Sequence, residues 1–188
     1  MISILTALRD EYRVKRPVTD GMIEKIAKGD TEELHELYEV ISATVFGFAL
    51  SITKNKQDAE DVLHETFIPV WQNAHCYKPN GKPMAWIFTI ARNFSNMKHR
   101  SAARFSDEEP ENQAQDIFSL AVCSENKIIL QKVFSILTEE ERQIVLLHAV
   151  GGIKHREISE VLGLPTGTVL SKYNRAIKKL KTALEGEM

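Results

Sequence analysis

The sequence predicts an all-α fold: two small helical domains joined by an acidic linker, the C-terminal one a helix-turn-helix. Apolar residues recur at intervals of three and four along the 188-residue chain, and no segment alternates as a strand does. Only nine glycines and six prolines interrupt this pattern. Between two helical regions, residues 105–116 hold five acids and no base, which is typical of a linker.

Composition narrows the class of protein further. Hydrophobic residues make up 43% of the chain, and 24 bases nearly balance 26 acids, for a net charge of −2. These values favour a globular core and exclude a wholly disordered chain, a collagen-like fibre and a disulfide-stapled miniprotein. No stretch approaches the ~18 apolar residues of a membrane span, and Cys76 and Cys123 have no C-x-x-C spacing. We therefore expect a cytoplasmic protein with no membrane partner.

Three helices are predicted in the N-terminal half. The first follows Asp30, which pairs with Glu33 as a plausible N-cap, and a single apolar stripe continues from there. The second begins near Asp58 and has an acidic and polar outer face. Residues 77–83 form a loop, because two prolines and an Asn-Gly pair do not fit inside one helix. The third helix covers residues 84 to about 100.

The C-terminal half has the clearest geometry in the sequence. Residues 138–141 are a capping box that begins a helix, and a Gly-Gly pair ends that helix. A helix of about residues 154–162 stops at a Gly-Leu-Pro turn, and a longer helix begins near Thr166 and runs to about residue 184. On this last helix an apolar stripe lies opposite a basic, hydroxyl-bearing stripe, and residues 166–181 contain five bases and no acid.

Two short helices joined by a tight glycine-containing turn, the second with these two stripes, meet the requirements of a helix-turn-helix. Such a helix can enter the major groove of DNA. Lys172, Arg175 and the hydroxyls can reach base edges there, while Lys178 and Lys179 lie near phosphates. A solvated helix face is the alternative for a charge run alone, but the turn spacing and the missing acids favour DNA. The net charge of −2 predicts weak binding to free duplex unless a partner holds the protein there.

A second basic cluster, at residues 92–104, lies near the aromatic residues Tyr77, Trp86, Phe88 and Phe94. Interleaved bases and aromatics suit opened or single-stranded DNA, because unpaired bases stack on flat apolar surfaces and the backbone attracts cations. The alternative is that these aromatic side chains belong to the core. The sequence leaves both interpretations open for each of them.

Three runs of sequence carry a family signature. They are DAEDVLHETFIPVW at residues 58–71, PMAWIFTIARNF at residues 83–94 and LTEEERQIVLLHAVGGIKHREISEVLGLPTGTVLSKYNRAIKKLK at residues 137–181. In order and spacing they closely resemble the extracytoplasmic-function (ECF) sigma factors of bacterial RNA polymerase. The resemblance covers about residues 21–184 and is far more specific than a lone helix-turn-helix.

The resemblance implies a division of the chain into four parts. Residues 1–20 are an N-terminal extension without an assigned role. Residues 21–100 form a sigma-2-like domain that docks on the clamp of the largest polymerase subunit and binds and melts the downstream promoter element. Residues 101–126 are the acidic linker, similar to the segment that threads the RNA channel. Residues 127–186 form a sigma-4-like domain that reads the upstream promoter element, with the flap of the second-largest subunit as its partner.

The resemblance also implies which residues make each contact. The polymerase-binding residues are Asp58, Asp61, Glu65, Ile68 and Gln72. The residues at the downstream promoter element are Tyr77, Asn80, Lys82, Trp86, Arg92, Asn93, Asn96 and Arg100. The residues at the upstream promoter element are Arg156, Thr166, Thr168, Leu170, Ser171, Lys172, Asn174, Arg175, Lys178 and Lys179.

Some positions depart from the family pattern. Pro69 lies inside the docking helix, where it removes one backbone hydrogen bond and is expected to kink the helix. Lys154 replaces the hydroxyl that usually caps the first helix of the helix-turn-helix, and His148 replaces a common arginine. Lys172 also replaces arginine. Because lysine cannot make the planar bidentate contact to guanine, the family's base specificity does not carry over to that position.

Other function classes fit less well. No Walker, Rossmann or nucleophile-elbow pattern occurs, and Ile68 stands where a zinc-binding H-E-x-x-H helix that starts at His64 needs its second histidine. We therefore expect no catalysis, no metal and no cofactor. The competing hypothesis is a helix-turn-helix regulator that acts without replacing a sigma factor, but it does not account for the motifs at residues 58–71 and 83–100. Whether a dedicated anti-sigma factor sequesters the protein is left open.

Overall fold

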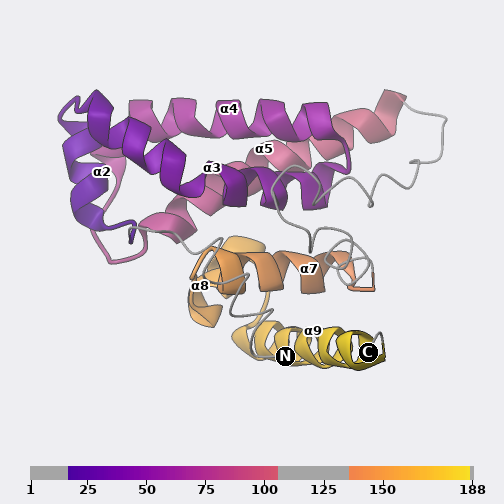
Figure 1. Cartoon of the computed structure of the whole chain (residues 1–188). Helices are drawn as coiled ribbons and strands as arrows, with labels where there is room; N and C mark the ends of the chain where they lie inside the picture. The colour runs from indigo at the N-terminus through magenta and orange to yellow at the C-terminus, as the bar shows by residue number, and fades with distance from the viewer. Residues whose placement is uncertain (1–16, 106–135, 187–188) are drawn as a thin grey trace.

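The computed structural model describes residues 17–105 and 136–186. In Figure 1 helices α3, α4 and α5 form one layer, and α7, α8 and α9 lie beneath it. Within the described ranges all regular structure is helical, as predicted. The expected N-terminal extension and the acidic run of the linker lie almost entirely outside these ranges.

The first two helices are α2 (Asp20–Ala27) and α3 (Thr31–Thr53). Asp30 caps α3 by accepting a hydrogen bond from the backbone N–H of Glu33 at 3.0 Å, which confirms the predicted cap. The sequence analysis missed α2, although Met22, Ile23 and Ile26 have helical spacing and are buried. The apolar pattern of an eight-residue helix is too short to be distinguished from the sequence on either side of it.

Helix α3 corrects one expectation. Its 23 residues are long and apolar enough to cross a membrane by length and composition, whereas the sequence analysis expected no such segment. Two thirds of the apolar window is buried inside the protein, and Leu37, Ile41 and Phe48 are fully enclosed. Its first half has an exposed polar face, whereas residues 44–53 are buried on all sides, since α3 packs against α4, α5, α7 and the turn after α7. It is a core helix.

Helices α4 (Lys56–Asn73) and α5 (Pro83–Phe105) complete the bundle, with the 3₁₀ turn η1 (Ala74–Cys76) between them. Most apolar residues of α4 are buried, among them Val62, Phe67 and Val70, whereas Trp71, also expected in the core, is half-buried. Pro69 lies inside α4, which continues through it to Asn73. Proline has no backbone N–H, so the carbonyl of Glu65, one turn earlier, has no helical donor.

The C-terminal helices are α7 (Glu139–Val145), the π-helical turn η3 (Leu146–Val150), α8 (His155–Leu162) and α9 (Thr166–Gly186). The predicted capping box is present: Thr138 and Glu141 exchange hydrogen bonds between side chain and backbone. Gly151 ends η3 where a β-carbon would lie 2.8 Å from the carbonyl oxygen of Leu147, so only glycine fits. Gly163, with φ of 64°, ends α8.

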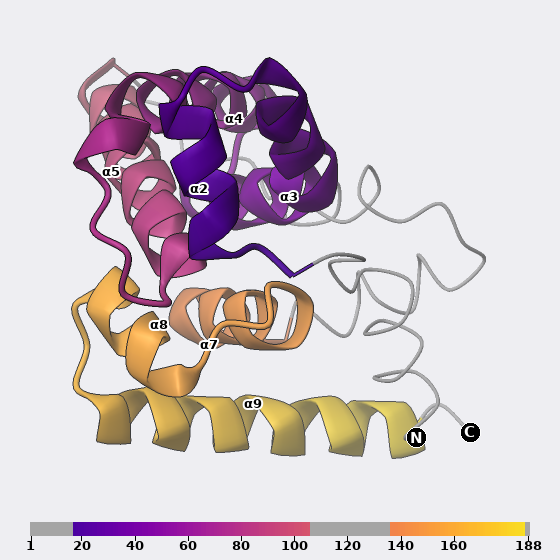
Figure 2. The same cartoon turned by 90° about the vertical axis from the view of Figure 1, so that its left-hand side faces the viewer.

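The two groups of helices pack against one another (Figure 2). Helix α5 contacts α8, and α3 contacts both α7 and η3, so one apolar core runs through both layers. Among the described residues, two ion pairs cross the boundary: Lys82 with Glu160 at 2.7 Å and Lys54 with Glu139 at 3.5 Å. Both pairs are partly solvent-exposed, so each contributes at most about 1 kcal/mol.

Candidate nucleic-acid interface

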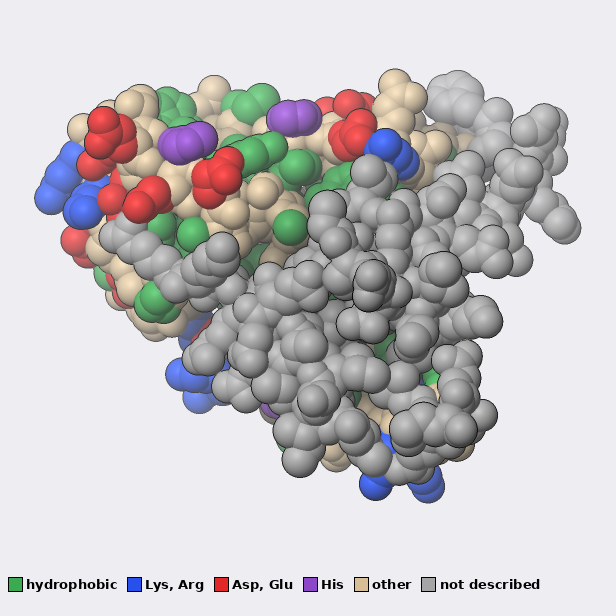
Figure 3. All heavy atoms as spheres, in the orientation of Figure 1, with side chains coloured by type: hydrophobic (Ala, Val, Ile, Leu, Met, Phe, Trp, Pro, Cys, Tyr) green, Lys and Arg blue, Asp and Glu red, His purple; other side chains and the backbone are tan. Residues whose placement is uncertain are grey.

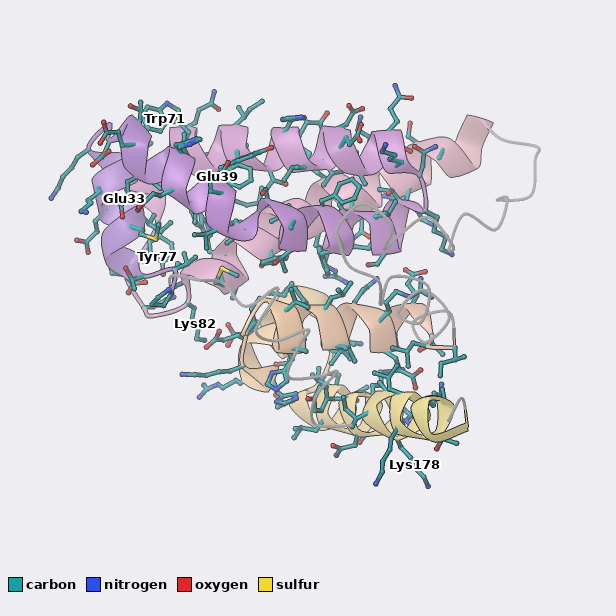
Figure 4. The ribbon with its side chains drawn as sticks, in the orientation of Figure 1. Glu33, Glu39, Trp71, Tyr77, Lys82 and Lys178 are labelled. Atoms are coloured by element: carbon teal, nitrogen blue, oxygen red, sulfur yellow. The ribbon has the colours of Figure 1, made fainter. Side chains whose placement is uncertain are left out.

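Helix α9 has one buried and one exposed face. Val169, Ala176 and Leu180 are buried, because they pack against α7 and α8. The opposite face is open to solvent, and its exposed side chains are Thr166, Leu170, Ser171, Asn174, Arg175, Lys178 and Lys181. Lys178 points away from the protein in Figure 4. The exposed residues recur every three or four positions, which gives one continuous stripe long enough to lie along a groove.

Two lysines that the sequence assigned to DNA are turned toward the protein. Lys172 is ion-paired with Glu140, and the ammonium group of Lys179 lies 2.7 Å from a carboxylate oxygen of Glu141. A helical-wheel argument cannot show this, because the acids come from α7, more than thirty residues earlier in the chain. Burial opposes ionisation of Glu141, but hydrogen bonds from Lys179 and from Thr138 outweigh it and lower the pKa of the carboxyl group. In this structure neither lysine belongs to the outward stripe.

The turn before α9 is held by side-chain hydrogen bonds. The hydroxyl of Thr166 donates to that of Ser159 at 3.1 Å, and Ser159 donates to the carbonyl of Arg156 at 2.6 Å. Arg156 is exposed, whereas Thr168 is half-buried at the edge of the stripe. Lys154 occupies the N-cap position of α8 and makes no capping hydrogen bond, as expected where a lysine replaces the usual hydroxyl residue. The turn before α9 is therefore tied to α8 through Thr166 and Ser159.

Behind the turn, two histidines and a tyrosine stack together. The rings of His148 and His155 lie 4.0 Å apart, and Tyr173 meets both edge-on at 4.9 and 4.8 Å. The Nδ1 of His148 lies 2.8 Å from the carbonyl oxygen of Ile153, whereas the Nε2 of His155 is buried without a hydrogen-bond partner. Burial, and then the proximity of His148, lower the pKa of His155. The neutral imidazole is the favoured form here.

A second surface is formed by α5 and the loop before it. Asn80, Asn93 and Arg100 are exposed. The remaining residues predicted for this surface are half-buried: Tyr77, Lys82, Trp86, Arg92 and Asn96. The ring of Tyr77 lies 5.1 Å from that of Trp86. Burial first, and then the hydrogen bond to Asp20 and its charge, raise the pKa of Tyr77 to about 12, so its hydroxyl stays protonated.

The aromatic residues of this region divide between core and surface. Phe88 is fully buried and meets Phe48 edge-on at 5.4 Å, so it is a core residue. Trp86 and Phe94 are half-buried against the core. Of the three, Trp86 stands beside the loop and lines a shallow pocket of about 270 Å³ with Tyr77, Asn80 and Lys82. Glu160 of α8 also lines this pocket.

The loop and α5 face α8 in this structure. Lys82 reaches across to Glu160 (Figure 4), and the guanidinium of Arg92 lies 3.7 Å from the position that a β-carbon on Gly163 would take. Lys82 and Arg92 are thus covered in part by the helix-turn-helix. DNA can contact both residues only if the two layers move apart.

The third surface is the outer face of α4. Asp58, Asp61, Glu65, Ile68 and Gln72 share one side of the helix at three- and four-residue spacing, as predicted. Ile68 is 55% exposed, which is high for a large apolar side chain. Lys98 of α5 pairs with both Asp61, at 2.8 Å, and Glu65, at 3.5 Å. In Figure 3 acidic side chains lie over the upper layer, most of them at the left where α2 and the beginning of α3 are, and basic ones project from the lower edge, where α9 lies.

Within residues 17–105 and 136–186, no three His, Cys, Asp or Glu side chains are grouped so that they could hold a metal ion. Cys76 is a free, exposed thiol beside the shallow pocket.

Comparison with protein families gives two matches in chain order. Residues 37–105 match the model of sigma-70 region 2, and residues 127–180 match that of sigma-70 region 4. Together they span about two thirds of the chain. The first covers α3 to α5, and the second covers α7 to α9.

Curated relatives agree with both matches. The chain is 27% identical to the ECF RNA polymerase sigma factor SigL of Mycobacterium tuberculosis over 168 residues, which cover 85% of this chain and 93% of the relative. It is 23% identical to SigK of the same organism over 180 residues, with 88% and 93% covered. The chain is an ECF sigma factor. As such it binds core RNA polymerase and directs promoter-specific initiation, and its family comprises initiation factors that are not known as enzymes.

Solved structures share the fold of this sigma factor. One is CnrH in complex with the cytosolic domain of CnrY, with 22% identity, a TM-score of 0.61, and 90% of this chain and 98% of that chain covered. Another is the sigma factor RpoE in complex with the anti-sigma factor NepR from Bartonella quintana, with 21% identity, a TM-score of 0.62, and 82% and 98% covered.

Proposed function

We propose that this alternative sigma factor divides its work among the three surfaces described above. The outer face of α4 docks on the clamp of the largest polymerase subunit. The loop at residues 77–82 and α5 bind and melt the downstream promoter element. The outward stripe of α9 reads the upstream element, next to the flap of the second-largest subunit. The acidic run of the linker, outside the described residues, follows the RNA channel between them.

One observation carries the proposal: two separate surfaces suited to DNA occur on different helical layers of one chain. The α9 stripe combines Ser171, Asn174 and Arg175, which can hydrogen-bond base edges, with Lys178 for phosphate. The α5 surface combines Trp86 with exposed amides and Arg100, which suits unpaired bases and a single-stranded backbone. A regulator that binds only duplex has no use for the second surface.

Each surface has support from its own chemistry. On α4, Ile68 supplies an exposed apolar centre flanked by acids, a composition that fits a partner with an apolar patch and basic rim.

Since the polymerase and the promoter are in the bacterial cytoplasm, we place the protein there. An anti-sigma factor, as in the complex of RpoE with NepR, is a further proposed partner.

The closed packing of the two layers has to open for this function. Lys82 and Arg92 contact α8, so promoter binding has to separate α5 from α8. The Lys82–Glu160 pair is partly exposed and contributes at most about 1 kcal/mol, but the apolar core that runs through both layers also has to open. Binding to polymerase and DNA has to supply that free energy.

The test is reconstitution with bacterial core polymerase. Because the net charge is −2, the purified protein should bind promoter duplex poorly, and adding core polymerase should give start-site-specific transcription when starts are mapped across a genomic template in vitro. Tight sequence-specific duplex binding by the protein alone, without transcription when polymerase is added, would support the helix-turn-helix regulator instead.

A further inference from the structure

We propose that Asp20 is a positioning residue for promoter opening: its carboxylate holds the 77–82 loop in the shape that receives unpaired DNA. The inference rests on the proposed function of that loop. Asp20 begins α2, which precedes the family match at residues 37–105, and none of the sequence motifs includes it.

Both carboxylate oxygens of Asp20 accept hydrogen bonds from the loop. One accepts a hydrogen bond from the hydroxyl of Tyr77 at 2.6 Å, and the other accepts the backbone N–H of Gly81 at 2.8 Å. The two donors are four residues apart in the loop. The contact therefore fixes the beginning and the end of the loop to the same side chain.

The remaining loop contacts reinforce this arrangement. The side-chain oxygen of Asn80 accepts the backbone N–H of Lys82 at 3.1 Å and lies 3.3 Å from the hydroxyl of Tyr77. Gly81 has φ of 73°, a conformation that side chains other than glycine rarely adopt. Because the loop has only three residues between its two anchor points, fixing both anchors leaves it little freedom.

The loop carries part of the candidate site for the downstream promoter element. The ring of Tyr77 lies 5.1 Å from Trp86, and both line the shallow pocket with Asn80 and Lys82. Releasing Tyr77 would let its ring leave Trp86 and change the wall of that pocket. An aromatic surface binds an unpaired base more tightly when it is already ordered, since ordering it during binding costs free energy.

Asp20 is not needed to hold α2 in place. Met22, Ile23 and Ile26 are buried and anchor α2 to the bundle by apolar contact. Removing the carboxylate should therefore free the loop without detaching the helix. This separates a positioning role from a general structural one.

The test compares Asp20→Ala with Glu24→Ala in the full-length protein bound to core polymerase. Glu24 is exposed and lies one turn further along α2, so it controls for the loss of one negative charge. Open-complex formation on duplex promoter DNA is followed by permanganate reactivity of unpaired thymines. We expect Asp20→Ala to slow opening about tenfold, because two hydrogen bonds to a charged acceptor are lost, and Glu24→Ala to leave it unchanged. Asp20→Asn keeps one strong acceptor and should fall between them.

Two further readouts exclude a merely structural effect. Affinity for core polymerase should be the same for Asp20→Ala and Glu24→Ala. The chain has two tryptophans, so in a Trp71→Phe background the emission of Trp86 reports on the loop alone, and Asp20→Ala should shift it. Tyr77→Phe, which removes only the hydroxyl, should reproduce part of both effects.

The outcomes distinguish this inference from the function on which it rests. Normal opening by Asp20→Ala, while Trp86→Ala and Lys82→Ala open slowly, would overturn the role of Asp20 and leave the loop as the promoter site. Normal opening by Trp86→Ala and Lys82→Ala would overturn the function proposed for the loop, and the inference with it. An equal loss of opening and of core affinity in Asp20→Ala would show a structural role only.

Discussion

Adjacent lysines on α9 should have different roles, and replacing each by methionine separates them. Lys178 is exposed on the outward stripe, whereas Lys179 lies 2.7 Å from Glu141, whose side chain is only 4% exposed. Both substitutions remove one positive charge and keep a long apolar stem. Only Lys179→Met leaves a buried carboxylate without its cation.

The expected magnitudes follow from burial. Removing one partner of a fully buried pair costs about 3–5 kcal/mol, but the side chain of Lys179 is 40% exposed and Glu141 keeps the N–H of Thr138, so we expect about 1–2 kcal/mol. That corresponds to a fall in melting temperature of about 2–8 °C. Lys178→Met should change stability by less than about 0.5 kcal/mol. It should instead lower the slope of log affinity against log salt by about 0.9, the value for one phosphate contact.

Urea unfolding of the free protein and salt titration of holoenzyme binding to promoter DNA measure the two effects. A double-mutant cycle with Glu141→Gln gives the coupling to Lys179 directly. The pH dependence of stability is a further check. Because the pKa of Glu141 is lowered in the fold, its carboxylate stabilises the protein at pH values above the ordinary pKa of a glutamate. That stabilisation is lost as the pH falls. If Lys179→Met leaves stability unchanged and flattens the salt slope by one contact, the pair with Glu141 does not persist on DNA and our assignment is wrong.

Three further predictions concern the other surfaces. Arg175→Ala should cost about 1–3 kcal/mol at the cognate upstream element and much less at a scrambled one in competition binding; equal losses on both would make the stripe a non-specific anchor. Ile68→Ala should weaken core polymerase affinity about tenfold without changing the urea midpoint, and unchanged affinity would mean that another face of α4 docks. Because the pKa of His155 is lowered in the fold, the unfolded chain binds a proton more readily, so stability should fall as the pH drops below the ordinary histidine value. His155→Phe should reduce that fall in urea unfolding at several pH values, and an identical pH dependence would exclude His155 as its source.

Local signals in the sequence predicted most of the helices. The caps at Asp30 and Thr138 involve residues three positions apart, and the apolar stripes of α3, α4 and α9 repeat within a few turns. Such patterns depend only on helix geometry. Met97 shows where that geometry stops being sufficient: it continues the apolar stripe of α5 but is 48% exposed.

The missed features all join distant parts of the chain. Asp20 meets Tyr77 across 57 residues, and Glu141 meets Lys179 across 38. Lys98 neutralises the α4 acids from another helix. A single sequence contains no periodicity from which such pairs follow, since they depend on how the helices are packed. The candidate surfaces could be predicted, but which of their charges remain available for a partner could not.

The apolar character of α3 has a consequence during synthesis. This helix leaves the ribosome before the chain that covers it, because α4 and α5 extend to Phe105 and η3 follows only at Leu146. At about 5–20 residues per second, an uncovered α3 persists for seconds. By length and composition alone α3 would pass for a membrane-spanning helix, and during that interval its apolar side chains are exposed. A variant that slows docking of α4 or α5 should therefore favour aggregation or capture by targeting factors, even if the finished fold is as stable as before.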